Sequence, residues 1–178
     1  INLNQIKLHL PFIEIKEIKK IFFVNGEILN SEKDINIKNL NSLLGDNLKN
    51  FNIENINFSS KNNFSFNVNK KLKISNVNLK SEINLNNLKY KNKFKELKEY
   101  LPNFEEFINF KEHKIFINYQ EDEFKIKGNG KLSVGQKNDK LVYEWSKMND
   151  NYTFNASAII KENILLFNAL NYKKKEDL

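Results

Sequence analysis

The chain carries a recurring pattern in which apolar and polar positions alternate until an Asn interrupts the alternation. With h for an apolar residue, the pattern is h-x-h-x-Asn-h-x-h. It is complete at residues 51–58, 72–79 and 83–90, it occurs at 1–8 with Gln5 in place of Asn, and 35–40 fits its first six positions. Five matches in one phase indicate an internal repeat.

The pattern describes a strand that has one apolar side and whose alternation shifts by one residue at the Asn. Alternation predicts a β-strand that buries one face. The Asn moves the next apolar residues by one position, which would turn them to the other face of a straight strand. A β-bulge would re-aim these side chains and bend the strand, and Asn suits a bulge because it tolerates left-handed backbone. Repeated bulges predict a sheet that curves steadily.

The second half of the chain predicts an antiparallel meander over 112–172, with turn-like segments between alternating strands and a last strand that runs to Tyr172. A short helical segment is expected at 91–111, where Phe94, Leu97 and Leu101 have helical spacing before Pro102, and a second helical turn is expected around Phe107. Segment 12–24 fits either a strand or a helix.

The expected fold is mainly β: a curved, mostly antiparallel, repeat-built sheet with an open, taco-like groove and one short helical insertion. Bulged strands occupy 1–90, the helical segment 91–111, the meander 112–172 and a polar tail 173–178. We expect these parts to form one continuous segment of a longer protein.

Charge is concentrated in one stretch of the chain. All 29 basic residues are Lys, and the net charge is +7. Residues 61–93 hold eight Lys against Glu82 alone. Such a stretch fits a solvated strand face that resists edge aggregation, or a surface that meets anionic lipid headgroups or an acidic partner. The candidates for headgroup contact are Lys70, Lys71, Lys73, Lys80 and Lys89. The absence of Arg disfavours a nucleic-acid partner.

Residues that carry catalysis or bind metals are not arranged in any familiar motif. Gly128-Asn129-Gly130 lies in a strand pattern without the Lys and helix of a phosphate loop. His9 and His113 have no acidic partner or second His at ligand spacing. Glu121, Asp122 and Glu123 fit a solvated hairpin tip better than a calcium loop. We therefore expect a protein that is not an enzyme, with no catalytic residue, metal or cofactor.

Fifteen Phe, six Tyr and one Trp give the chain many large apolar side chains. Most fit a core, but a single curved sheet would leave one apolar face that nothing obvious covers. Such a face binds something apolar or packs against more of the same protein. The first two apolar positions of each complete repeat are the candidates for the lining of a groove: Phe51, Ile53, Leu72, Ile74, Ile83 and Leu85.

The repeats, together with an Asn25-Gly26-Glu27-Ile28 step and the strand from Ile126 to Leu132, resemble the AsmA-like superfamily, which includes YhdP- and TamB-type envelope bridge proteins. The resemblance implies a periplasmic protein of a Gram-negative bacterium, anchored in the inner membrane through parts outside this chain. It also implies a long β-sheet with an apolar groove that helps to move phospholipid towards the outer membrane. The chain departs from the family in its richness in Asn and Lys and in lacking an N-terminal membrane helix.

The leading hypothesis for function is therefore a non-enzymatic segment that shields or conducts phospholipid, or another apolar ligand, along the β-groove. Its other expected partners are flanking repeats of the same chain. The alternative is a structural β-solenoid or adhesin-like scaffold segment whose apolar faces are all covered internally and which has no lipid ligand.

Overall fold

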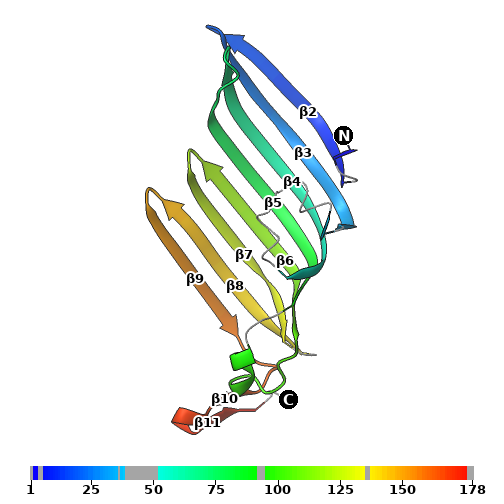
Figure 1. Ribbon diagram of the computed structural model, residues 1–178, viewed down its shortest axis with the longest axis vertical. Coiled ribbons are helices and arrows are strands. Elements are labelled where there is room, and N and C mark those ends of the chain that lie inside the picture. The colour runs from blue at the N-terminus through cyan, green and yellow to red at the C-terminus, as the bar shows by residue number, and fades with distance from the viewer. Residues whose placement is uncertain are drawn as a thin grey trace.

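A computed structural model describes residues 2–3, 6–35, 37–38, 52–91, 95–134 and 137–175. Nine antiparallel strands form one open sheet, in which each strand lies beside its neighbours in sequence (Figure 1). The strands are β1 (Asn2–Leu3), β2 (Ile6–Ile18), β3 (Ile21–Ile35), β4 (Ile53–Asn69), β5 (Ile74–Lys91), β6 (Phe107–Gln120), β7 (Glu123–Val134), β8 (Lys137–Met148) and β9 (Asn151–Ile159). The predicted fold class, a mainly β, antiparallel and open sheet, is confirmed.

The bulges predicted at the Asn positions are present in all three complete repeats. In the pairing of β4 with β5, one extra β4 residue lies between Ile53 and Asn55, and one extra β5 residue lies between Leu85 and Asn87. A third bulge lies between Ser75 and Asn78, and there Asn76 has a left-handed φ of 52°. Because each bulge absorbs one residue, the apolar residues before and after it stay on the same side of the sheet.

The match at residues 1–8 is not a bulged strand, and this expectation was wrong. β1 and β2 pair with each other, with Leu3 opposite Ile6, so the chain reverses where the pattern predicted continuous strand. The partial match at 35–40 lies mostly outside the described residues.

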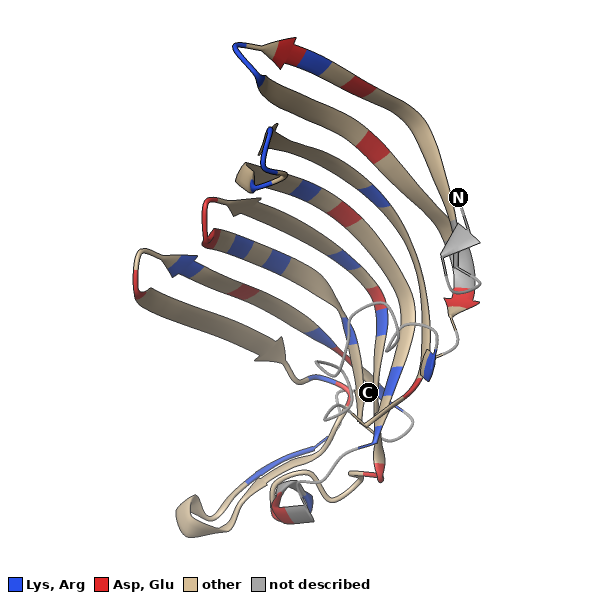
Figure 2. Cartoon of the chain, turned by 45° about the horizontal axis from the view of Figure 1, so that its top comes forward, with Lys and Arg blue, Asp and Glu red and all other residues tan. Residues whose placement is uncertain are grey.

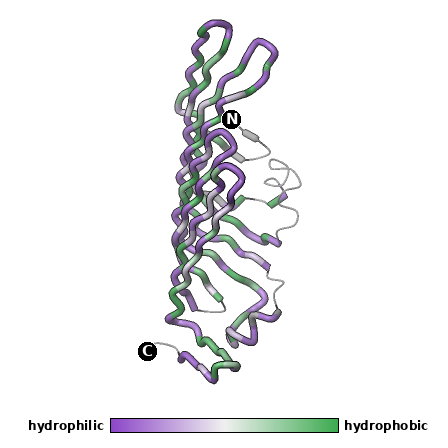
Figure 3. Tube along the Cα trace, turned by 90° about the vertical axis from the view of Figure 1, so that its left-hand side faces the viewer, coloured by the Kyte–Doolittle hydropathy of each residue, from purple (hydrophilic) through white to green (hydrophobic). Residues whose placement is uncertain are grey.

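One face of the sheet is mainly apolar and the other mainly polar, and Figure 3 shows the alternation along the strands. The polar side also exposes some apolar side chains: Phe12, Phe23, Phe116 and Val142. One row of cross-strand partners is apolar: Ile117, Ile126, Trp145 and Phe154. The next row points to the opposite side and is polar: Asn118, Lys125, Ser146 and Thr153. We call these two sides the apolar face and the polar face.

The strands bend along their length (Figure 2). In the middle of the sheet, Ile117 and Ile126 on the apolar face are half-buried, whereas Phe116 on the polar face is 49% exposed. Side chains on the inner side of a curved sheet crowd one another and lose exposure. This difference is what is expected if the apolar face is the inner side.

The two ends of the strands differ. At one end, which we call the tip end, four tight turns join β2 to β3, β4 to β5, β6 to β7 and β8 to β9. The opposite end, the base end, includes the connection from β5 to β6 and the C-terminal segment (Figure 1). That segment forms a small hairpin of β10 (Leu165–Phe167) and β11 (Tyr172–Lys174), joined by a 3-10 helix, η3 (Asn168–Leu170).

Two secondary-structure predictions need correction at the base end. The helical segment is a five-residue 3-10 helix, η2 (Lys95–Glu99), and Phe107 already lies in β6, where it pairs with Lys91. The last strand does not run on to Tyr172, because the chain turns at η3 and Asn171 takes a left-handed φ of 52°. Segment 12–24, left open between strand and helix, is the hairpin of β2 and β3.

Candidate functional site

The tip end of the apolar face exposes large apolar side chains to solvent. On β2, at one side of the sheet, Ile13 is 55% and Ile15 is 61% exposed. At the opposite side, Trp145 is 43%, Tyr152 is 64% and Phe154 is 67% exposed. Burial of such groups is the main driving force of folding, so a contiguous exposed set indicates a surface that something else contacts.

Half-buried side chains fill the face between these flanks. Phe124 contacts Trp145 with 4.9 Å between the ring centroids and Tyr152 with 6.4 Å. Phe64 and Phe66 stack at 6.0 Å on β4. The result is an aromatic and aliphatic surface that continues across the sheet from β2 to β9.

The dimensions of the face follow from the strands that build it. β4 has 17 residues and β5 has 18, which at about 3.3 Å per residue gives a contour length of roughly 55–60 Å. Eight long strands at about 4.8 Å spacing give a width of roughly 35 Å. The length exceeds the roughly 30 Å thickness of the hydrocarbon layer of a bilayer.

At the base end, the same face is covered and tightly packed. Leu85 is 7% exposed and His113, its cross-strand partner, is 1% exposed. The glycines of β7 leave room for these rings. A Cβ on Gly130 would lie 2.4 Å from the ring of His113, and one on Gly128 would lie 2.2 Å from the ring of Tyr143. The Gly128–Gly130 pair is therefore a packing feature of the face.

His113 belongs to this packed region. Its Nε2 lies 3.0 Å from the carbonyl oxygen of Lys131, to which it donates a hydrogen bond, while Nδ1 is buried and has no hydrogen-bond partner among the described residues. Burial lowers the pKa of His113, and the bond to the carbonyl partly opposes that shift. The neutral imidazole is accordingly favoured, and its place among Phe110 and Tyr143 makes it a core side chain.

Where β3, β4 and β5 meet, polar side chains interrupt the apolar face, and they bond to the sheet itself. Glu17 in β2 and Lys147 in β8 also lie on this side, opposite Phe22 and Phe124. Asn30 Nδ2 donates to the carbonyl of Phe58 at 3.1 Å. Asn62 Nδ2 donates to the carbonyl of Ile28 at 3.2 Å and to Ser60 Oγ at 2.9 Å. Because these groups already have partners within the protein, this region offers little hydrogen-bonding specificity to a ligand.

The predicted groove residues do not share one environment. Ile53 and Ile83 are half-buried on the apolar face, and Leu85 is buried at the base end. Ile74 lies on the same face at the tip end and is 57% exposed. Leu72 is not in a strand: it lies in the turn between β4 and β5 and is 81% exposed. Phe51 lies outside the described residues.

The lysines that were predicted to contact headgroups also lie in different parts of the sheet. Lys70, Lys71 and Lys73 lie at the turn between β4 and β5, whereas Lys80 is on the polar face. Lys89 pairs with Glu54 at 3.0 Å, and its ammonium lies 3.9 Å from the centre of the Phe107 ring.

Sequence reasoning missed Lys19 and Lys20, which form the turn between β2 and β3. This turn is next to the β4–β5 turn, because Ile21 pairs with Asn69. The adjacent Lys pair was visible, but its place in space depended on reading segment 12–24 as a hairpin.

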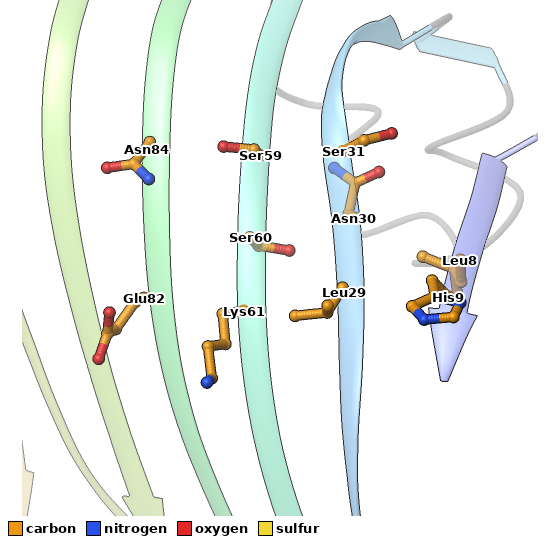
Figure 4. Close-up of a pocket in the computed structure, with 10 residues that line it drawn as sticks. All are labelled: Leu8, His9, Leu29, Asn30, Ser31, Ser59, Ser60, Lys61, Glu82 and Asn84. Atoms are coloured by element: carbon orange, nitrogen blue, oxygen red, sulfur yellow. The ribbon is translucent and has the colours of Figure 1, made fainter. Parts of the chain in front are cut away.

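The polar face contains a shallow hollow of about 520 Å³ over β2 to β5 (Figure 4). It is lined by Leu8, His9, Leu29, Asn30, Ser31, Ser59, Ser60, Lys61, Glu82 and Asn84. The ammonium of Lys61 pairs with Glu27 at 2.9 Å, and this contact raises the pKa of Lys61. Exposed ion pairs of this kind contribute little to stability and are typical of a solvated face.

Within the ranges that the structure describes, no three His, Asp or Glu side chains gather as a metal-ligand set. No helix in these ranges is long and apolar enough to span a bilayer. Comparisons with protein-family models, curated proteins and solved structures find no match to this chain.

Proposed function

We propose that the apolar face binds acyl chains and shields them from water, as a passive, non-enzymatic surface for phospholipid or another apolar ligand. The observation that carries the proposal is the exposure of Ile15, Ile74, Trp145, Tyr152 and Phe154 on one continuous face. A sheet normally buries such a face against a second layer. At the tip end, the described chain supplies no such layer.

The chemistry of the face favours an acyl chain over a polar ligand. Its lining is mainly aliphatic and aromatic, and the amides of Asn30 and Asn62 bond to the sheet itself. Binding of an apolar ligand to such a surface is favourable in proportion to the area buried, by about 25 cal/mol per Å² of apolar surface removed from water. The apolar face would therefore bind chains of different lengths with little selectivity, and the headgroup would remain in water.

The resemblance to the AsmA-like superfamily supports the same function and suggests its setting. We infer a periplasmic segment, held at the inner membrane through other parts of a longer protein, along which phospholipid travels. Flanking repeats would continue the sheet. The scaffold alternative predicts instead that the apolar face is covered by protein and takes up no lipid.

The single tryptophan gives a direct test, because Trp145 lies on the apolar face and is 43% exposed. The probe is a lysophospholipid with a brominated acyl chain, added to the purified chain below its micelle concentration. We expect saturable quenching of the Trp145 fluorescence, and a blue shift with the unbrominated lipid. Absence of saturable quenching would overturn the proposal.

Two aspartate substitutions at exposed Phe residues on opposite faces sharpen the test. Phe154, the cross-strand partner of Trp145, is 67% exposed on the apolar face, and Phe116 is 49% exposed on the polar face. Phe154→Asp should weaken lipid binding by about tenfold or more, equivalent to roughly 1.4 kcal/mol. Phe116→Asp should leave it unchanged, and equal losses in both variants would contradict a binding site on the apolar face.

A further inference from the structure

Two neighbouring turns at the tip end concentrate positive charge. Lys19 and Lys20 form the turn between β2 and β3, and Lys70, Lys71 and Lys73 surround the turn between β4 and β5. The turns are adjacent because Ile21 pairs with Asn69 across β3 and β4. Among the residues that the structure describes, none of these five lysines forms an ion pair.

Apolar side chains alternate with these lysines and are exposed. Ile18 is 54% and Ile21 is 38% exposed on either side of Lys19 and Lys20. Leu72, between Lys71 and Lys73, is 81% exposed, and Ile74 is 57% exposed. Basic and apolar groups that project together from one edge suit an interface in which charge meets headgroups and apolar groups enter the layer beneath.

The backbone at Leu72 indicates that folding alone does not explain this residue. Leu72 has a φ of 58°, and its N–H donates to the carbonyl of Asn69 at 2.9 Å to close the turn. The Asn69 side chain supports the turn by accepting bonds from the N–H groups of Lys71 and Lys73. Gly is the usual residue at a left-handed position that closes such a turn, and a bulky Leu there is strained. An exposed and strained apolar residue points to a role outside the fold.

The turn between β2 and β3 also has left-handed backbone at residues other than Gly. Lys19 and Lys20 have φ values of 50° and 68°, a conformation that favours Asn and Gly in two-residue hairpin turns. Two adjacent like charges in strained backbone weaken the hairpin slightly. The same backbone occurs at Glu121 and Asp122 in the β6–β7 turn, with φ values of 49° and 72°, so it is common to these two-residue turns. The basic turns differ from the acidic turns in their charge.

The remaining two turns at the tip end are acidic and stand further back. They carry Glu121 and Asp122, and Asp150 (Figure 2). Towards the tip end, the pairing of β5 with β6 ends at Asn78, which lies opposite Ser65 of β4. β4 continues beyond Ser65 for three more residues to Val68, which pairs with Ile74. The basic turns thus project by roughly 10 Å more, about one screening length at 0.1 M salt. A negatively charged surface could meet the basic turns without meeting the acidic ones.

We propose that the β2–β3 and β4–β5 turns form a membrane-docking tip. Lys19, Lys20, Lys70, Lys71 and Lys73 contact the phosphates of anionic lipid headgroups, while Leu72 and its apolar neighbours enter the interfacial layer. A nucleic acid would use the charge but not the exposed Leu72, so a lipid surface fits the whole set better. This site is separate from the apolar face, although it would bring the tip end of that face to a source of lipid.

Vesicle sedimentation with the full chain tests the docking tip. The vesicles contain phosphatidylcholine alone or an equimolar mixture of phosphatidylcholine and phosphatidylglycerol. We expect binding to the mixed vesicles, weakened by salt, and much weaker binding to the neutral ones. Equal binding to both kinds of vesicle would overturn the proposal.

Two variants with a matched control locate the contact. Lys71→Gln should weaken binding to mixed vesicles roughly fivefold, whereas Lys80→Gln, which removes the same charge from the polar face, should have little effect. Leu72→Asn should also weaken binding, while its melting temperature stays the same or rises because Asn tolerates the left-handed backbone. Equal effects of Lys71→Gln and Lys80→Gln, or unchanged binding by Leu72→Asn, would contradict a docking tip.

The proposal of a docking tip and the proposal of an acyl-binding face can be tested independently. Leu72→Asn should leave the quenching of Trp145 by brominated lysophospholipid unchanged, and Phe154→Asp should leave salt-sensitive vesicle binding unchanged. In the last experiment, binding of a double-stranded DNA oligonucleotide is compared with binding of mixed vesicles. If DNA binds as tightly as mixed vesicles and Leu72→Asn does not alter either affinity, the basic turns are a general polyanion site and the membrane assignment is wrong.

Discussion

The base end and the tip end of the apolar face are built from the same strands but differ in what covers them. Leu85 and Ile74 are both on the apolar side of β5, eleven residues apart, yet their exposures are 7% and 57%. Alternation and bulges place both side chains on one face. The surroundings of each side chain, which alternation does not encode, decide which becomes core: Leu85 lies opposite His113, which is 1% exposed.

The base end is organised by the segments that return to it. Phe104, in the connection from β5 to β6, is 7% exposed. The C-terminal hairpin joins the same connection, because the N–H of Leu166 donates to the carbonyl of Tyr100 at 2.8 Å and the rings of Tyr100 and Phe167 are 5.7 Å apart. Stability should therefore be concentrated at the base end, and the tip end should tolerate substitution.

The largest expected effect is that of shortening a base-end side chain. Leu85→Ala should lower the free energy of unfolding by about 2–5 kcal/mol, because it removes buried methyl groups and leaves a cavity. Denaturant unfolding followed by circular dichroism measures the change. Ile15→Ala is the control at the tip end, where Ile15 is 61% exposed. Similar losses in the two variants would show that the two ends do not differ in stability.

A smaller loss is expected when the C-terminal cover is released. The Asp139 carboxylate accepts bonds from the N–H groups of Lys161 and Glu162 at 2.7 and 2.9 Å, and from Asn163 Nδ2 at 2.7 Å. Asp139→Ala leaves these donors without their acceptor and should cost about 1.5–3 kcal/mol.

Hydrogen exchange shows which segments lose stability in Asp139→Ala. In Asp139→Ala, protection should decrease first in 161–174, which follows β9 and includes the C-terminal hairpin. Asp139→Asn keeps one acceptor oxygen and should lose less. Uniform loss of protection across β2 to β9 would contradict a local anchoring role for Asp139.

The third effect depends on pH and comes from His113. Burial lowers its pKa from the ordinary value of 6.5, so the folded protein resists a proton that the unfolded chain accepts. The free energy of unfolding should therefore be highest above pH 6.5, fall as the pH drops through 6.5 towards the lowered pKa, and level off below it. The slope for one proton is at most about 1.4 kcal/mol per pH unit.

Urea unfolding between pH 5 and pH 8 measures this slope, and His113→Gln removes the titrating group. The substitution should flatten the profile in this range even if it lowers stability overall. An identical slope in the parent and in His113→Gln would show that another group is responsible.

The fold could be predicted from the sequence because its signals are local. The repeated Asn indicated bulges, and Asn76 adopts the left-handed backbone expected of it. The failures occurred where a longer-range contact or a turn overrode the local pattern. Leu72 fits an apolar strand position but closes a turn, and Phe107 fits a helical spacing but pairs with Lys91 in the sheet.

The candidate site could be predicted only in outline. Alternation predicted that Ile53, Ile74, Ile83 and Leu85 would share the face of their strands that lines a groove. In the structure they lie on the apolar face, and that this face binds a ligand stays a prediction. The difference in exposure between Leu85 and Ile74 depends on their surroundings, which no repeat pattern encodes: Leu85 lies opposite the buried His113, and Ile74 lies next to the β4–β5 turn. The basic tip was seen only in part, because Lys19 and Lys20 are about fifty residues from Lys70 in the chain and become its neighbours through β3 and β4.

The smallest effect on stability is expected at Ile74, and it separates a binding surface from a core most sharply. Ile74 is 57% exposed, so the carboxylate of Ile74→Asp remains in water and avoids the cost of burying a charge. The free energy of unfolding should change by no more than about 0.5 kcal/mol, while retention of co-purified phospholipid, measured by native mass spectrometry, should fall. Thermal melts of Ile74→Asp beside the parent provide the stability control. If Ile74→Asp unfolds or aggregates, the tip end is a core that this chain shares with a protein partner, and the scaffold function would replace the lipid-binding one.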